Sequence, residues 1–146
     1  MEKNNNALFY TCSLIEYIAR TTFNHRHDIL NYLGDDLKNI YNYADVFHCE
    51  PIMKVADDFI TKDQIKNGNY DVISRCKYLI PDYWDIGEVF ERLIEDVTEN
   101  EADVFEGINN VYNSWLTPEI LNFNTDLYYQ PRDYIAECYK AGRILE

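Results

Sequence analysis

Hydrophobic residues recur every three or four positions along most of this chain, which is the spacing of an amphipathic α-helix. The pattern is clearest between residues 86 and 97, where six apolar residues follow it: Ile86, Val89, Phe90, Leu93, Ile94 and Val97. Alternating apolar and polar runs, which predict half-buried strands, are nearly absent. We therefore predict an all-α fold, a compact bundle of about six to eight short helices.

Turn-forming residues and caps divide the rest of the chain into further helices. They are predicted at residues 7–21, 25–33, 35–44, 51–62 and 101–116, in a short segment beginning with Thr117-Pro118, and at residues 131–141. Glu16 and Arg20 are spaced as an i,i+4 ion pair on the first helix. Asp85 and Glu88 have the spacing of a capping box, which predicts that the helix through residues 86–97 starts at Asp85.

Residues 67–69, Asn-Gly-Asn, form the clearest turn in the sequence. The turn separates an N-terminal helical half, residues 1–66, from a tyrosine-rich helical half, residues 70–146. A chain of 146 residues fits one domain with a shared core or two small helical subdomains. Residues 72–80 fit either an irregular helix or a short buried strand, and Pro81 ends the segment in both cases.

Negative charge is concentrated in the second half of the chain. The net charge is −13, and residues 79–146 carry 15 acidic residues against 4 basic ones. Between Asp82 and Glu106 the only cation is Arg92. Such a field repels nucleic acids and anionic membranes and favours a basic protein surface. No apolar run is long enough to span a membrane, so we expect no direct nucleic-acid and no membrane partner.

On the helix through residues 86–97, the apolar stripe must face the core, so its acidic side chains, Asp96 included, are expected to face water. Two aromatic residues precede this helix, and we expect both to be partly exposed. The predicted partner-binding surface consists of these two aromatic residues and four glutamates: Tyr83, Trp84, Glu88, Glu91, Glu95 and Glu99. The alternative is a solvated helix face, which an i,i+4 pair of Glu88 with Arg92 favours. The like charges of Glu91 and Glu95 at the same spacing favour a binding surface.

The residue types that carry metal or nucleophilic chemistry are few. His25 and His27 are two positions apart, so on a helix they point in different directions and do not share an ion. No Glu-x-x-His motif, paired zinc-type cysteine spacing or glycine-rich phosphate loop is present. We read the four cysteines as reduced core residues. The sequence therefore predicts no metal and no cofactor, and His48 beside Cys49 leaves a small His/Cys enzyme as the alternative.

Three segments carry a resemblance to a known family: FYTCSLIEY at residues 9–17, DILNYLG at residues 28–34 and IYNYADVFH at residues 40–48. They resemble a small bacterial helical domain of unknown function, whose members tend to be encoded beside ADP-ribosyltransferase-like toxin proteins. The resemblance covers about residues 8–62. It implies a bacterial, cytoplasmic setting and a toxin-neutralising or regulatory role, and it supplies no catalytic residues.

Charge, aromatic content and this resemblance together predict a non-enzymatic, acidic protein-binding module. It would act like an antitoxin, immunity protein or inhibitor by covering a basic surface of its partner, a toxin or a nuclease. With a nuclease as target, the carboxylates could take the positions of phosphates and mimic nucleic acid. Two alternatives remain from other classes: a small enzyme that uses a His/Cys site, and a structural homodimer whose apolar face completes the core.

Overall fold

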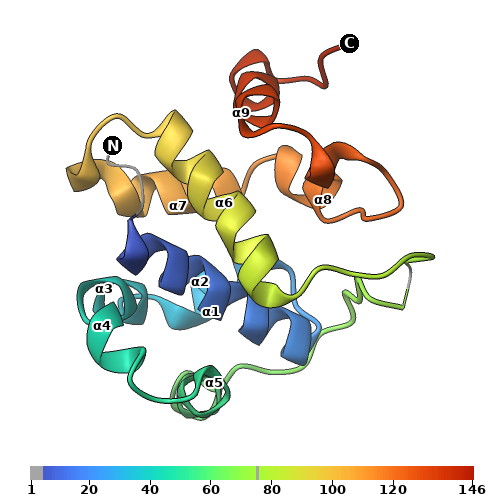
Figure 1. The fold of residues 1–146 in the computed structure, drawn as a ribbon. Helices are drawn as coiled ribbons and strands as arrows, with labels where there is room; N and C mark the ends of the chain where they lie inside the picture. The colour runs from blue at the N-terminus through green and yellow to red at the C-terminus, as the bar shows by residue number, and fades with distance from the viewer. Residues whose placement is uncertain (1–4, 75) are drawn as a thin grey trace.

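The computed structural model describes residues 5–74 and 76–146 (Figure 1). Within these residues the chain forms nine α-helices and two short 3₁₀ helices, and no strand. The elements are α1 (Asn6–Thr22), α2 (Arg26–Leu33), α3 (Asp36–Asn42), α4 (Ala44–Phe47), α5 (Ile52–Lys62), α6 (Tyr83–Val97), η1 (Glu101–Asp103), α7 (Val104–Tyr112), α8 (Leu116–Ile120), η2 (Leu127–Tyr129) and α9 (Arg132–Ala141). The predicted all-α fold is confirmed.

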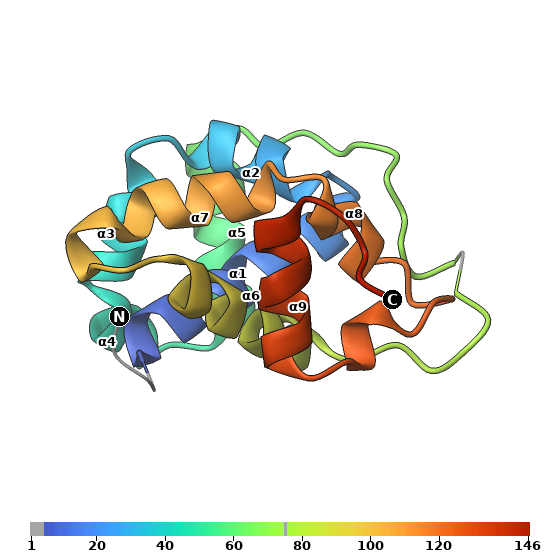
Figure 2. The same cartoon turned by 90° about the horizontal axis from the view of Figure 1, so that it is seen from above.

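Helices α1 and α6 pack against each other at the centre of the molecule. Helices α2, α3, α4 and α5 surround α1, whereas α7 and α9 pack on α6 (Figures 1 and 2). The two central helices approach closely at Gly87. A Cβ atom there would lie 2.8 Å from both the Cα and the amide nitrogen of Ser13. Because backbone atoms cannot move aside as a flexible side chain can, only glycine fits this crossing.

One hydrophobic cluster of buried residues runs from α1 to α9. Helix α1 is buried on nearly every face, with Leu14, Ile15 and Ile18 fully enclosed. On α6, Phe90 and Ile94 are equally buried, and Phe90 stacks on Tyr112 of α7 with ring centroids 4.8 Å apart. The N-terminal and C-terminal halves of the chain thus meet at the contact between α1 and α6.

A charged pair lies inside this core. Arg26 donates from Nε to both carboxylate oxygens of Glu16, at 3.1 and 3.2 Å, and from Nη2 to Oε1 at 2.7 Å. Both side chains are almost completely buried. The predicted pairing of Glu16 with Arg20 was therefore wrong. Helix α1 ends at Phe23, whose φ of 58° turns the chain back, and this turn brings Arg26 alongside Glu16. Arg20 instead donates to the carbonyl of Pro81 at 2.7 Å.

Two local predictions differ from the structure. The helix predicted at residues 35–44 is divided into α3 and α4 at Tyr43, whose ψ of 27° departs from helical geometry. Residues 72–74 and 76–80 form turns and irregular backbone, neither the helix nor the strand that we considered. Within that segment the carboxylate of Asp71 accepts the amides of Ile73 and Ser74, a local turn that competes with regular structure.

Candidate functional site

Helix α6 begins three residues earlier than the predicted capping box indicates. Asp82 is the N-cap, and its Oδ1 accepts the backbone N–H of Asp85 at 2.8 Å. The predicted start at Asp85 was therefore wrong, although a carboxylate does cap the helix. Tyr83 and Trp84 consequently lie in the first turn of α6, directly beside the exposed carboxylates of Asp82, Asp85 and Glu88.

The acidic side chains of α6 do not form the continuous exposed row that we expected. Glu88 and Glu99 are exposed, but Glu91 and Glu95 are only 5% and 6% exposed. The apolar stripe predicts that α6 is covered on one side, whereas α1 packs on one side of the helix and α9 on another. These contacts bury a wider arc of the helix than the apolar stripe alone requires. The expectation that Glu91 and Glu95 face water was wrong.

Asp96 also differs from its expected place in water, because an arginine of α9 binds it. Arg132 donates from Nε to Oδ2 at 3.0 Å and from Nη2 to Oδ1 at 2.7 Å. Both side chains are partly buried. A two-bonded pair of this kind fixes orientation as well as distance, so it holds α9 against the C-terminal end of α6.

Glu91 and Glu95, one turn apart on α6, form a carboxyl–carboxylate pair. Burial, together with the hydrogen bond to Glu95 and its negative charge, raises the pKa of Glu91 to about 8. At neutral pH Glu91 therefore carries a proton that it shares with its neighbour. Among the described residues, no group other than Glu91 is placed to donate to the enclosed Oε2 of Glu95.

Tyr83 and Trp84 are half-buried rather than freely exposed. Trp84 lies beside Phe9, with ring centroids 5.6 Å apart, and Tyr83 meets Tyr17 edge-on at 5.0 Å. Both partners belong to α1, so the two rings join the start of α6 to the central helix. Each ring keeps part of its surface in water, as the sequence indicates.

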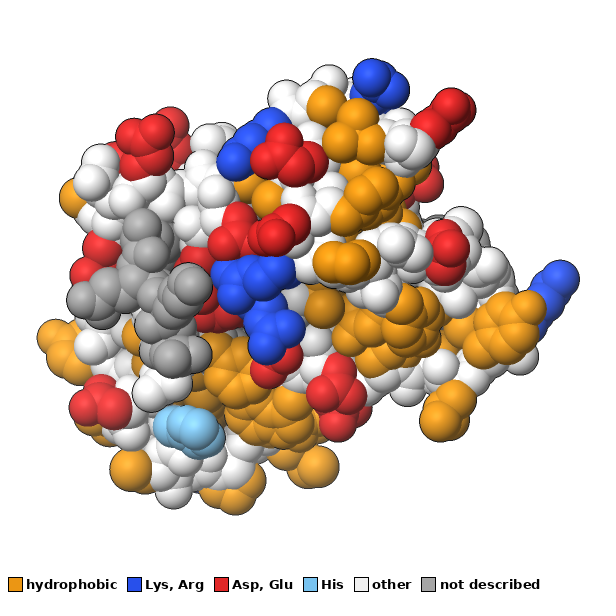
Figure 3. Space-filling model, turned by 45° about the horizontal axis from the view of Figure 1, so that its top comes forward, with side chains coloured by type: hydrophobic (Ala, Val, Ile, Leu, Met, Phe, Trp, Pro, Cys, Tyr) orange, Lys and Arg blue, Asp and Glu red, His pale blue; other side chains and the backbone are white. Residues whose placement is uncertain are grey.

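An open groove lies at the N-terminal end of α6, and we call it the α6 groove. It has a volume of about 580 Å³ and is lined by Leu79, Ile80, Pro81, Asp82, Asp85, Glu88, Val89, Tyr128 and Tyr129. Leu79 is 93% exposed and Tyr129 is 59% exposed. Figure 3 shows hydrophobic side chains gathered across this face of the molecule with acidic side chains at their border. An exposed apolar surface with a charged rim is typical of protein-binding sites.

The carboxylates of the groove affect one of its two tyrosines, Tyr128. Burial, followed by the negative charges of carboxylates that include Asp85, Asp82 and Glu88, raises the pKa of Tyr128 well above its ordinary value. The groove therefore presents an apolar floor within a negative field. The N-cap and the first two turns of α6 supply all three carboxylates.

Sequence reasoning found Glu88 but missed the apolar side of the groove. The run from Tyr78 to Pro81 was read as the end of an irregular helix or of a short buried strand, whereas Tyr78 and Leu79 are among the most exposed apolar residues described. The available signal was the lack of any helical or strand periodicity in residues 72–80.

His48 and Cys49 both line a cavity of about 710 Å³, but no hydrogen bond joins them among the described residues. Cys49 is exposed, so its predicted place in the core was wrong, and its Sγ donates to the carbonyl of Asp45 at 3.4 Å. The ring of His48 lies 5.2 Å from that of Tyr10. Cys12 and Cys138 are buried and Cys76 is half-buried, and all four thiols are free.

His25 and His27 lie at the start of α2 with their rings stacked 5.3 Å apart, and Tyr70 stacks on His25 at 3.9 Å. The prediction that the two histidines point in different directions was wrong, because His25 is the N-cap residue, whose extended backbone lies outside the helix. In the part of the chain that the structure describes, no three side chains of His, Cys, Asp or Glu are grouped to hold a metal ion.

Comparisons with protein-family models, with curated proteins and with solved structures find no match to this chain. Residues 5–74 and 76–146 include no helix with the length and apolar character needed to cross a bilayer.

Proposed function

We propose that this protein is a non-enzymatic binding module whose α6 groove holds an apolar and basic segment of another protein. The observation that carries the proposal is the exposure of Leu79 beside Tyr129, next to the carboxylates of Asp85 and Glu88. A leucine side chain left in water forgoes about 1.5–3 kcal/mol of burial free energy. A partner that covers it recovers that free energy.

Charge decides which partner suits the groove. Asp82, Asp85 and Glu88 form its rim. Among the described residues, the only basic side chain that pairs with any of them is Arg92, whose Nη2 lies 2.9 Å from Oε1 of Glu88. This pair is solvent-exposed, so it contributes little and can exchange for a partner's lysine or arginine. The net charge of −13 adds a long-range attraction for basic proteins, which raises the rate of association.

In this proposal the protein acts as an antitoxin, immunity protein or inhibitor by occlusion, in a bacterial cytoplasm. The partner's apolar side chains contact Leu79, Val89 and Tyr129, and its cations contact the rim. Tyr83 and Trp84 border the first turn of α6 and extend the contact area. Nucleic-acid mimicry has no support, because it requires a row of exposed carboxylates, and Glu91 and Glu95 are buried.

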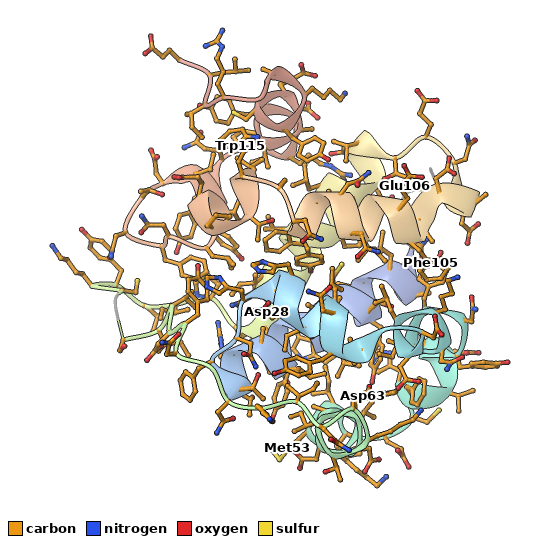
Figure 4. All side chains as sticks on the ribbon, turned by 180° about the vertical axis from the view of Figure 1, so that it is seen from behind. Asp28, Met53, Asp63, Phe105, Glu106 and Trp115 are labelled. Carbon is orange, nitrogen blue, oxygen red and sulfur yellow. The ribbon has the colours of Figure 1, made fainter. Side chains whose placement is uncertain are left out.

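The test uses two variants, expressed in the cells that naturally produce the protein. One carries a photo-crosslinking amino acid at position 79, and the control carries it at position 53. Met53, labelled in Figure 4, is 60% exposed on α5 and does not line the groove. Position 79 should crosslink to a protein through a peptide rich in Lys or Arg and apolar residues, and position 53 should not. Mass spectrometry of the crosslinked peptide gives its composition.

A charge-reversed double variant, Asp85→Lys with Glu88→Lys, should reduce the crosslinking at position 79 by about tenfold or more. Its matched control is Glu106→Lys with Asp57→Lys. This control changes the net charge equally and also reverses one first-turn and one mid-helix carboxylate, on α7 and α5. Equal loss in both variants, crosslinking to an acidic peptide, or crosslinking only to a second copy of the chain would contradict the proposal.

A further inference from the structure

One wall of the α6 groove is a stretch of irregular backbone, Leu79, Ile80 and Pro81, and we call it the 79–81 segment. Figure 1 shows the chain running through it, without a helical coil, into the start of α6. Among residues 5–74 and 76–146, no group forms a hydrogen bond with the backbone N–H or C=O of Leu79 or of Ile80. Two backbone donors and two acceptors thus lie unpaired in the wall of the groove, beside the exposed side chain of Leu79.

The 79–81 segment is held at both of its ends. Before it, the amide of Lys77 donates to Oδ1 of Asn124 at 3.0 Å. At its end, the carbonyl of Pro81 accepts Nη2 of Arg20 at 2.7 Å. Pro81 also restricts the residue before it to extended backbone conformations. A partner therefore meets an extended backbone that is already fixed in place, which lowers the entropy cost of binding to it.

The unpaired backbone groups limit which kind of partner can fill the groove. A partner that covers Leu79 also removes water from the neighbouring amides, and an amide that loses water without gaining an acceptor destabilises the complex. The side chains of lysine and arginine carry only donors, and apolar side chains carry neither donors nor acceptors. An apolar and basic partner can therefore satisfy these amides only with its own backbone carbonyls. Most carbonyls of a helix are already bonded within the helix, whereas those of an extended segment are available.

We infer that the partner binds in the α6 groove as an added strand, whose backbone is hydrogen-bonded to that of the 79–81 segment; this inference rests on the proposed function. In strand addition, backbone hydrogen bonds supply affinity and alternate side chains supply specificity. Because successive side chains of an extended chain point to opposite faces, the partner should alternate apolar residues, which contact the groove floor, with cations, which face the acidic rim. A second copy of this chain is disfavoured as the occupant, because it would bring two acidic rims together.

The test is an NMR titration of the ¹⁵N-labelled whole chain with two heptapeptides of the same composition. The peptide LKLKLKL alternates like a strand, whereas LKKLLKL has helical spacing. We expect the alternating peptide to shift the amide resonances of Leu79 and Ile80 and to bind about tenfold or more tightly than its isomer.

Backbone methylation of the alternating peptide shows whether its main chain forms the hydrogen bonds. Methyl groups on the backbone nitrogens of all its leucines block one edge of the strand, and methyl groups on those of all its lysines block the other edge. An added strand pairs through one edge only. One methylated form should therefore bind about tenfold or more weakly than the parent peptide, and the other should bind like it.

The Asp85→Lys and Glu88→Lys double variant separates this inference from the proposed function. The alternating peptide should bind the double variant about tenfold or more weakly than the wild type, and should bind the Asp57→Lys and Glu106→Lys control like the wild type. If that loss occurs but the two isomers bind equally, or the two methylated forms lose affinity equally, the inference alone is overturned.

Two results would overturn the proposed function together with the inference: neither isomer binds the wild type, or the alternating peptide binds the double variant as tightly as the wild type. Shifts in the 79–81 segment that depend on the concentration of the chain, without any peptide, would show that a second copy occupies it. That result would also overturn the inference.

Discussion

The buried pair of Glu16 and Arg26 gives the sharpest prediction about stability. Removing only the arginine, in Arg26→Met, leaves a carboxylate with no accessible surface and no counter-ion. Breaking a buried pair from one side is expected to reduce the free energy of unfolding by about 3–5 kcal/mol. Glu16→Met leaves the guanidinium of Arg26 in the same position and should have a similar effect.

The double variant, Glu16→Met with Arg26→Met, should be more stable than either single variant. It removes both charges together, and replacing a buried pair by apolar residues is often neutral or stabilising. The native pair is itself imperfect, because Nη1 of Arg26 is buried without a hydrogen-bond partner among the described residues. The coupling between the two sites should therefore approach the summed effects of the two single substitutions.

Urea unfolding followed by circular dichroism measures these changes. With a slope of about 2 kcal/mol per molar urea, each single substitution should lower the midpoint by about 1.5–2.5 M, whereas the double variant should lie close to the wild type. Lys54→Met is the control, because Lys54 forms only exposed ion pairs, with Glu50 and Asp58, and its replacement should leave the urea midpoint almost unchanged. Single-variant losses that simply add in the double variant would refute the reasoning.

Two further predictions concern α6. Gly87→Ala should destabilise the fold by about 1–3 kcal/mol in the same urea assay, because the new Cβ meets the backbone of Ser13; an unchanged midpoint would contradict the close crossing. Folding raises the pKa of Glu91 from 4.5 to about 8, so the folded state holds this proton more tightly than the unfolded state does. The free energy of unfolding should therefore fall as the pH rises from 4.5 to about 8, by up to about 1.4 kcal/mol per pH unit. Glu91→Gln should remove this slope and the exposed-site control Glu88→Gln should retain it, whereas a slope that survives in Glu91→Gln would show that another group is responsible.

The sequence predicted the helices well because their apolar stripes report directly which face is buried. Ile86, Phe90 and Ile94 follow the stripe and are fully enclosed. The start of α6 was less certain, because Asp82 and Asp85 are both suitable caps before the same stripe. Only the structure shows that Asp82 accepts the amide of Asp85.

The charged residues were harder to place, because their surroundings depend on contacts between distant segments. Glu16 has Arg20 at ideal helical spacing, yet the turn at Phe23 brings Arg26 to it. Glu91 lies outside the apolar stripe, and it is buried because α9 packs beside α1 on the same helix. A one-dimensional pattern identifies the face of a helix that must be buried, but not the neighbours that cover its remaining faces.

The central claim is that the α6 groove selects a segment that is both apolar and basic. The most direct measurement selects a random peptide library on the immobilised wild-type chain, with the Asp85→Lys and Glu88→Lys double variant as the counter-selection target. The account predicts enriched peptides that combine Lys or Arg with Leu or aromatic residues and that fail to bind the reversed variant. Enriched peptides without positive charge, or peptides that bind both proteins equally, would contradict it.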